Sequence, residues 1–229
     1  MVFEHITVPG LDFELEATTT EAGRIYSIPS GKKYASITTV LSDYKKDVLQ
    51  NWIDRVGQVE ADRIKNQAAR RGEGFHDAYE KYIRNQLTQL DIRRLFPHVH
   101  ELFIPLKKHI DANVGKVYAI EQPLYSDRLK IAGRVDLIAE WAGKISVLDF
   151  KSSKRLKEEN DIENYFMQCS GYCEMFEERT GIVIEQIVVA IGVEGGMSQI
   201  FVKEKHKYLP MLEEYIGNFY HTTKLNVIL

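Results

Sequence analysis

The stretch "GRVDLIAEWAGKISVLDFKSS", residues 133–153, limits what this chain can fold into more than any other segment. Two runs rich in apolar and β-branched residues flank an Ala-Gly pair, which is the pattern of a β-hairpin. The turn runs from Trp141 to Lys144, and Gly143 supplies the positive φ angle that a tight hairpin turn requires. Loops of two and of four residues both fit the sequence, and both give the same register between the strands.

In this register two aspartates face each other across the hairpin. Asp136 lies directly opposite Asp149, with Cβ atoms roughly 4.5–5.5 Å apart, and Lys151 points to the same face because side chains alternate along a strand. Facing carboxylates repel each other unless a cation lies between them, so a divalent metal with oxygen ligands is one interpretation. A solvated sheet face with an Asp–Lys ion pair is the other. The opposite face of the hairpin is mostly apolar and is expected to face the core: Val135, Leu137, Ala139, Ser146, Leu148 and Phe150.

The composition is that of an ordinary globular protein. Of the 229 residues, 44% are hydrophobic and 28% are charged, which is enough apolar material to bury a large core. No run of 18 apolar residues is present, so we expect no transmembrane helix and no membrane contact. The start, "MVFEHITVPG", lacks the pattern of a signal peptide. A cytoplasmic protein is therefore expected.

The charge is close to balanced, at a net −3, and gives the molecule as a whole no attraction for nucleic acid. Two local groups of cations could still bind it, although such runs are often solvated helix faces, and both interpretations stay open. The first group contains Arg63, Lys65, Arg70 and Arg71, and the second contains Lys151, Lys154, Arg155 and Lys157.

The two cysteines, Cys169 and Cys173, lie four residues apart on an expected helix. In a reducing compartment they are small core residues. An iron–sulfur cluster needs four cysteine ligands, so this cofactor is not expected in the chain.

Three stretches of different character follow one another without a linker. Residues 1–37 contain short segments that alternate like strands, residues 38–113 have apolar residues at helical spacing, and residues 114–229 alternate strands with helices. The pattern predicts a single α/β domain. Its centre is a mixed β-sheet flanked by helices, with a helical insertion near the N-terminus.

Glycines mark two further features of this organisation. Gly72 and Gly74 are expected to interrupt the helical region just before His76. A helix over about 161–180 is expected to end at Gly181, because glycine readily adopts the left-handed conformation that closes a helix.

The hairpin and its surroundings resemble the PD-(D/E)XK nuclease superfamily. "GRVD" followed by "DFK" is similar to the core motif of that family, in which both aspartates bind metal. Val135 stands where the proline of the family name would be, a departure that is common in this branch. Upstream, "RRGEGFHDAYEKY" is similar to the helix that carries a metal-binding histidine in these nucleases.

The RecB-like branch of the family is indicated by Gln168 and Tyr172, which match its Q-x-x-x-Y motif. "SITTVL" followed by "NWIDRVG" is similar to the mitochondrial genome maintenance exonuclease group and its phage-encoded relatives. The resemblance covers roughly residues 34–175. It implies a restriction-endonuclease-like fold, in which residues 38–113 form an arch-like helical region and residues 114–229 form the nuclease core.

The activity implied by the resemblance is a metal-dependent DNA exonuclease that hydrolyses single-stranded DNA with a free end, in DNA replication, repair or recombination. The cofactor would be Mg²⁺ or Mn²⁺, and for a phage-encoded protein the location would be the host cytoplasm. A structure-specific endonuclease is one alternative, and a nucleic-acid-binding accessory module without turnover is another. Protein partners are not specified by the sequence.

The resemblance also implies which residues hold the metal. These are Asp136, Asp149 and the backbone carbonyl of Phe150, joined by His76 and, as a weaker candidate, Glu121. Taken alone, His76 also fits an ordinary helix histidine and Glu121 a surface strand residue.

Lys151 would position or deprotonate the attacking water, or offset developing negative charge. Gln168 and Tyr172 share a helix face, and a core-facing stripe is their alternative to a catalytic role. The residues expected to contact nucleic acid are Arg63, Arg70, Arg71, Lys154, Gln168 and Tyr172.

Overall fold

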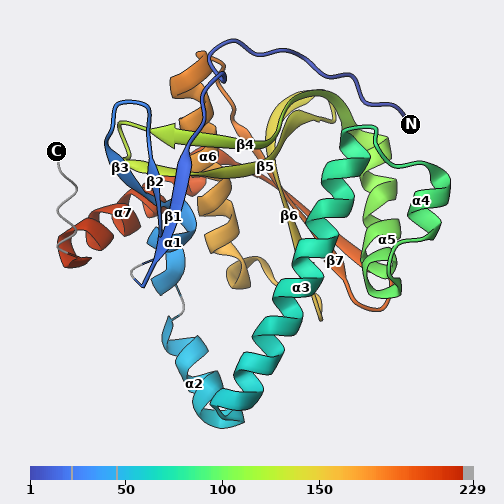
Figure 1. Ribbon diagram of the computed structural model, residues 1–229, viewed down its shortest axis with the longest axis horizontal. Helices are drawn as coiled ribbons and strands as arrows, with labels where there is room; N and C mark the ends of the chain where they lie inside the picture. The colour runs from blue at the N-terminus through green and yellow to red at the C-terminus, as the bar shows by residue number, and fades with distance from the viewer. Residues whose placement is uncertain (22, 45, 224–229) are drawn as a thin grey trace.

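A computed structural model of the protein describes residues 1–21, 23–44 and 46–223. In this part of the chain eight strands form one mixed sheet, in the order β1-β2-β3-β5-β6-β7-β8, with β4 paired to β5. Helices cover both faces of the sheet (Figure 1), so the predicted α/β fold with a central mixed sheet is confirmed. The strands are β1 Glu16–Thr20, β2 Gly23–Ser27, β3 Lys33–Ser36, β4 Val114–Ser126, β5 Ile131–Trp141, β6 Lys144–Ser153, β7 Gln186–Val193 and β8 Met197–Glu204.

The helices divide between the two faces of the sheet. The apolar side chains of α3 and α5 form one core with the sheet, and those of α6 and α7 form the other. Helix α6 ends as predicted at Gly181, which has φ 74° and donates its N–H to the carbonyl of Glu177. None of the helices in the described ranges is long and apolar enough to cross a membrane. The helices are α1 Ile37–Val40, α2 Lys46–Val56, α3 Gln58–Ile83, α4 Gln89–Arg93, α5 Pro97–Asn113, α6 Glu163–Thr180 and α7 Leu209–Thr223.

The hairpin of β5 and β6 has the predicted register. Trp141 pairs with Lys144, and the ladder continues to Leu137 and Leu148. The loop has two residues, Ala142 and Gly143, with φ angles of 50° and 80°. Positive φ at both loop positions is the turn geometry whose twist matches that of the flanking strands, and this settles the loop length that the sequence left open.

The two strands separate immediately beyond this ladder. Ile131 and Ala132 of β5 pair with β3, whereas β6 continues along β7 as far as Ser153. The separation begins at Asp136 and Asp149, so the predicted direct pairing of these residues is not part of the ladder. We call this divergence of β5 and β6 the fork.

The fork also changes which face one side chain occupies. Leu137 and Leu148 pack on the α3 side of the sheet, as predicted. Val135 is buried in the core as predicted, but it packs on the α6 side of the sheet rather than on the face of Leu137 that it was expected to share. The simple alternation of side chains holds only while the strand stays in a regular ladder, and β5 leaves its ladder with β6 at this point.

Helix α3 runs without a break through Gly72 and Gly74, contrary to the predicted interruption. The reason is packing: a Cβ atom on Gly74 would lie 3.0 Å from Val99 Cγ2 of α5, and one on Gly72 would lie 3.8 Å from Ser152 Oγ of β6. Gly74 allows close approach of α3 to α5, whereas a Cβ atom on Gly72 would make only an ordinary contact. Tertiary contacts outweigh the low helix propensity of both glycines.

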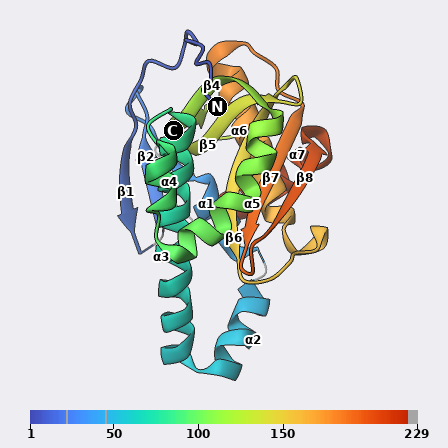
Figure 2. The same cartoon turned by 90° about the vertical axis from the view of Figure 1, so that its right-hand side faces the viewer.

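Only part of the helical region 38–113 extends away from the sheet. Helix α2 and the N-terminal half of α3 project together beyond the body of the molecule (Figures 1 and 2), and α2 has no buried residue. The C-terminal half of α3 and all of α5 instead pack on the sheet. We call α2 and residues 58–70 of α3 the arm.

Candidate active site

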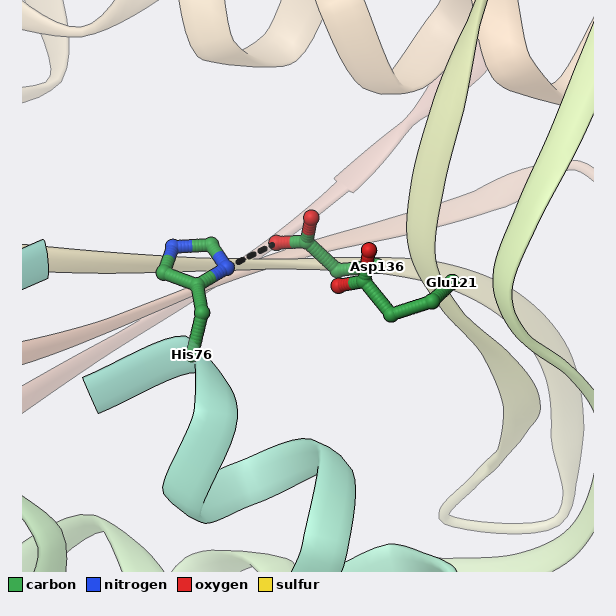
Figure 3. Close-up of side chains that lie close together, drawn as sticks. All are labelled: His76, Glu121 and Asp136. Carbon is green, nitrogen blue, oxygen red and sulfur yellow. Dashed lines mark ion pairs between the residues drawn. The ribbon is translucent and has the colours of Figure 1, made fainter. Parts of the chain in front are cut away.

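Asp136 lies at the fork, where it joins the two diverging strands through its side chain. Its Oδ2 atom accepts a hydrogen bond of 2.8 Å from the backbone N–H of Phe150 in β6. The same oxygen lies 3.5 Å from Nδ1 of His76, which projects from α3 toward it (Figure 3). The structure therefore brings His76 and Asp136 together, as the sequence predicted.

Glu121 completes this group from the neighbouring strand β4. Its chain neighbours Ile120 and Gln122 pair with Leu137 and Val135, so Glu121 stands beside Asp136 in the sheet. It has φ 48°, an uncommon angle for a residue other than glycine and one that often occurs at functional sites. Ligand atoms of His76, Glu121 and Asp136 all lie within 4.8 Å of one another (Figure 3).

The electrostatics of Glu121 fit a site for a divalent cation. Burial raises the pKa of Glu121 to about 7, and the nearby carboxylates of Asp136 and Glu80 add to the rise. In the absence of another cation, a proton partly offsets this crowding of negative charge. Two carboxylates and an imidazole are suitable ligands for Mg²⁺ or Mn²⁺, with the imidazole favouring Mn²⁺.

The shifted pKa predicts that the stability of the metal-free protein depends on pH through Glu121. The carboxyl ionises near 4.5 ordinarily and near 7 in the folded protein. Between these values the folded state holds the proton more tightly, so stability falls as the pH rises through this window, by about 3 kcal/mol at most. In chelator, melting curves of Glu121→Gln should fall less steeply than wild type from pH 4.5 to pH 7. Equal slopes for the two proteins would contradict the assignment.

Asp149 and Lys151 form an ion pair on the adjacent part of β6. Lys151 Nζ lies 2.6 Å from Oδ1 and 2.5 Å from Oδ2 of Asp149. The ion pair that the sequence offered as the alternative to a metal site thus exists, but its aspartate side chain is only 2% exposed rather than solvated. Asp149 does not belong to the close group of His76, Glu121 and Asp136 in the described structure.

Burial and neighbouring charges shift the pKa values of this pair in a consistent way. Burial raises the pKa of Asp149 to about 6 despite the adjacent Lys151 ammonium, and Asp136 contributes to the rise. Burial alone would lower the pKa of Lys151, but Asp149 and Asp136 outweigh it and raise the pKa above its usual value. Lys151 is therefore an ammonium group at neutral pH.

Helix α6 brings three further side chains toward the fork. Tyr172 packs against Gly133 of β5, where a Cβ atom would lie 2.8 Å from its ring and hydroxyl. Burial raises the pKa of Tyr172 well above its usual value, Asp136 adds to the rise, and Gln168 opposes it. The ring of Tyr165 lies over Lys151, with Nζ 5.1 Å from the ring centroid. Tyr165 was missed, although its spacing from Gln168 and Tyr172 places it on the same helix face.

The cations expected to contact nucleic acid lie in different surroundings. Arg63 is on the exposed arm, paired with Glu60 of the same helix. Arg70 and Lys154 are exposed, and Lys154 is close enough to Glu60 to help lower its pKa, after the larger effect of Arg63. Arg71, in contrast, pairs with Glu194 in the turn between β7 and β8, and only 11% of its side chain is exposed.

A groove lies between the arm and the segment that follows β6. Three aromatic residues, Tyr44, Trp52 and Tyr165, line it together with cations of both sides. Among its described lining residues none is acidic. Trp52 and Arg55 were not predicted as groove residues, because their helical spacing is typical of an ordinary amphipathic helix. The cations that line the groove are Arg55, Arg155 and Lys157.

Comparisons with known proteins agree with this geometry. A family model described as the PD-(D/E)XK nuclease superfamily matches residues 47–215. Mitochondrial genome maintenance exonuclease 1 of Mus musculus is 30% identical over 86 residues, which are 38% of this chain and 25% of that protein. The Homo sapiens protein of the same name is 31% identical over 86 residues, 38% of this chain and 24% of that protein. The match thus spans about a quarter of the length of these curated relatives.

Among solved structures, a protein from Eubacterium rectale that is provisionally named an exonuclease has a TM-score of 0.45 and 11% identity, over 66% of each chain. The family model extends over more than half of the sequence. The chain therefore belongs to the PD-(D/E)XK nuclease superfamily.

Proposed function

We propose that this nuclease is a divalent-metal-dependent DNA exonuclease that acts on single-stranded DNA with a free end, in DNA replication, repair or recombination. The observation that carries the proposal is the fork. There a group of two carboxylates and an imidazole lies next to a buried Asp–Lys pair. Membership of the nuclease superfamily supports phosphodiester hydrolysis as the reaction.

The ligands of the cation in this proposal are Asp136, Glu121 and His76, which are already within 4.8 Å of one another. Asp149 and the carbonyl of Phe150 remain predicted ligands on the neighbouring strand. A bound divalent cation lowers the pKa of water and neutralises charge on a scissile phosphate. The backbone N–H of Phe150 holds the Asp136 carboxylate in place, through the 2.8 Å hydrogen bond across the fork.

Lys151 has a different task in the proposal. Its ammonium group pairs with Asp149 beside the proposed metal ligands. It therefore orients the attacking water by donating a hydrogen bond, and it offsets the negative charge that develops on the phosphate. Tyr165 covers Lys151 from the groove side and restricts its rotamers, while Gln168 and Tyr172 border the site from α6.

The groove supports a single strand as the substrate. Proteins that bind single strands combine cations along the backbone path with aromatic rings on which bases stack. Trp52 and Tyr165 supply such rings, and Arg55, Arg155 and Lys157 supply cations. Tyr165 lines the groove and its ring lies over Lys151, so a strand in the groove would pass next to the site. The projecting arm, with Arg63 and Arg70, would guide a strand that enters by its end (Figure 2).

Digestion of single-stranded DNA in linear and in circular form tests the proposal, with Mg²⁺ and with Mn²⁺. We expect end-labelled linear strands to be degraded and circular strands of the same sequence to survive. Equal cleavage of both forms would favour the structure-specific endonuclease. Binding of both forms without cleavage of either would favour the accessory module. Asp136→Asn serves as the control for contaminating nucleases.

A further inference from the structure

We propose that Arg71 is a positioning residue. Its ion pair with Glu194 holds the C-terminal half of α3 on the sheet and thereby keeps His76 at the distance from Asp136 that a shared cation requires. The inference rests on the proposed function for the identity of the metal site. It gives Arg71 a task different from the nucleic-acid contact expected from the sequence.

The ion pair connects α3 to the strand that carries Lys151. The guanidinium of Arg71 donates through Nη1 to Oε1 of Glu194. The backbone N–H of Glu194 donates in turn to the carbonyl of Ser153, over 3.0 Å. Ser153 follows Lys151 by two residues on β6. The same turn of α3 lies within ordinary contact distance of this strand, since a Cβ atom on Gly72 would lie 3.8 Å from Ser152 Oγ.

A second anchor lies one turn further along the same face of α3. Phe75 packs on Gly192 of β7, where an added Cβ would lie 3.0 Å from two atoms of the phenyl ring. Residues four apart share a helix face, so Arg71 and Phe75 fix the helix on the sheet at two points. Two contacts along one face of a helix fix its rotation about its own axis as well as its distance from the sheet. The rotation of α3 decides where His76, the residue after Phe75, directs its imidazole.

The position of Arg71 along α3 explains why such an anchor is needed. The N-terminal half of α3 leaves the sheet as part of the arm (Figures 1 and 2), and Arg71 directly follows the arm residues 58–70 in the chain. In the described structure the ion pair of Arg63 on that side is made to Glu60, within the helix. A DNA strand that pulls on the arm would therefore rotate or shift α3. Arg71 holds the helix at the point where the arm begins.

Arg71 is much less exposed to solvent than the cations that are accessible to a nucleic acid. Its side chain is 11% exposed, whereas that of Arg63 is 57% exposed. To bind Arg71, a phosphate would have to displace Glu194, whose side chain is 40% exposed, from a guanidinium that is largely buried. Loss of either partner leaves the other charge partly buried and unpaired.

Four variants test the inference: Arg71→Met, Glu194→Gln, the double charge reversal Arg71→Glu with Glu194→Arg, and Lys81→Met. Lys81 is the matched control, because its ion pair with Asp77 lies on the exposed surface of the same helix. The affinity for Mn²⁺ is measured by titration calorimetry without DNA. Affinity for a single-stranded oligonucleotide is measured in chelator, and kcat and KM are measured with the metal.

We expect Arg71→Met and Glu194→Gln each to raise the Kd for Mn²⁺ about 10–100-fold, as for residues that orient metal ligands. At fixed Mn²⁺ the value of kcat falls, while the oligonucleotide Kd and KM stay close to wild type. The double charge reversal recovers most of the lost Mn²⁺ affinity. Lys81→Met keeps wild-type values throughout.

The inference is overturned if Arg71→Met weakens oligonucleotide binding at an unchanged Kd for Mn²⁺ and Glu194→Gln behaves as wild type. Arg71 would then be a nucleic-acid contact. Should Arg71→Met fail to fold, Glu194→Gln decides, because a folded variant with wild-type Mn²⁺ affinity also overturns it. A wild-type protein that does not bind Mn²⁺ would instead overturn the metal site itself, and the positioning role with it.

Discussion

Lys151→Ala is expected to lower the rate of single-stranded DNA hydrolysis by at least about 10²-fold, the usual lower range for loss of proton-transfer or charge assistance. The ammonium group lies 2.5–2.6 Å from both oxygens of Asp149 and next to the group of His76, Glu121 and Asp136. Removing it takes away the cation that pairs with Asp149 beside this group. Oligonucleotide affinity should change little, because the groove cations are retained.

The same substitution is expected to destabilise the metal-free protein. It leaves the buried carboxylate of Asp149 without its partner, at a cost of about 3 kcal/mol. Lys205→Met is the control that separates folding from chemistry. Lys205 is another largely buried lysine, paired with Glu174 and Glu177, and its loss should lower the melting temperature but not kcat. Turnover by Lys151→Ala within about tenfold of wild type, measured well below its melting temperature, would remove Lys151 from the chemistry.

Asp136→Asn is expected to abolish both turnover and stabilisation by metal. Wild-type protein at Mn²⁺ concentrations 100 times Kd should gain roughly 2.7 kcal/mol of unfolding free energy. The variant should gain none, because it loses the ligand that lies between His76 and Glu121. In chelator its melting temperature should equal or exceed that of wild type. The amide oxygen can still accept the N–H of Phe150, and repulsion with Glu121 is relieved.

Asp149→Asn is the informative comparison for this prediction. It also removes a negative charge, but it leaves the ammonium of Lys151 without its partner. In chelator this variant should be less stable than wild type, by about 3 kcal/mol. Melting curves in chelator and in Mn²⁺ measure both effects. An unchanged wild-type midpoint at saturating Mn²⁺ would contradict the metal site, and equal stability of the two variants would contradict the different tasks of the two aspartates.

Local sequence patterns predicted much of the fold. The register of the hairpin followed from one turn and the alternation of side chains, and the end of α6 followed from Gly181. The order of strands and helices followed from periodicity. Gly74 was misinterpreted because its effect depends on Val99, which approaches it closely from another helix. Helix propensity is a weak local preference, and packing between elements overrides it.

The sequence by itself determined which chemical groups this protein has at its candidate site: Asp136, Asp149, Lys151 and His76 are all recognisable from local motifs and their order. The tertiary structure alone decided how they combine. Strand pairing brings Glu121 beside Asp136. Because β5 and β6 diverge, Asp149 is separated from this group and forms an ion pair with Lys151. Arg71 looks like its exposed neighbour Arg70 in the sequence, but it meets Glu194, 123 residues away. The partner of a charge depends on which distant segments the folded core brings together, and local sequence does not contain that information.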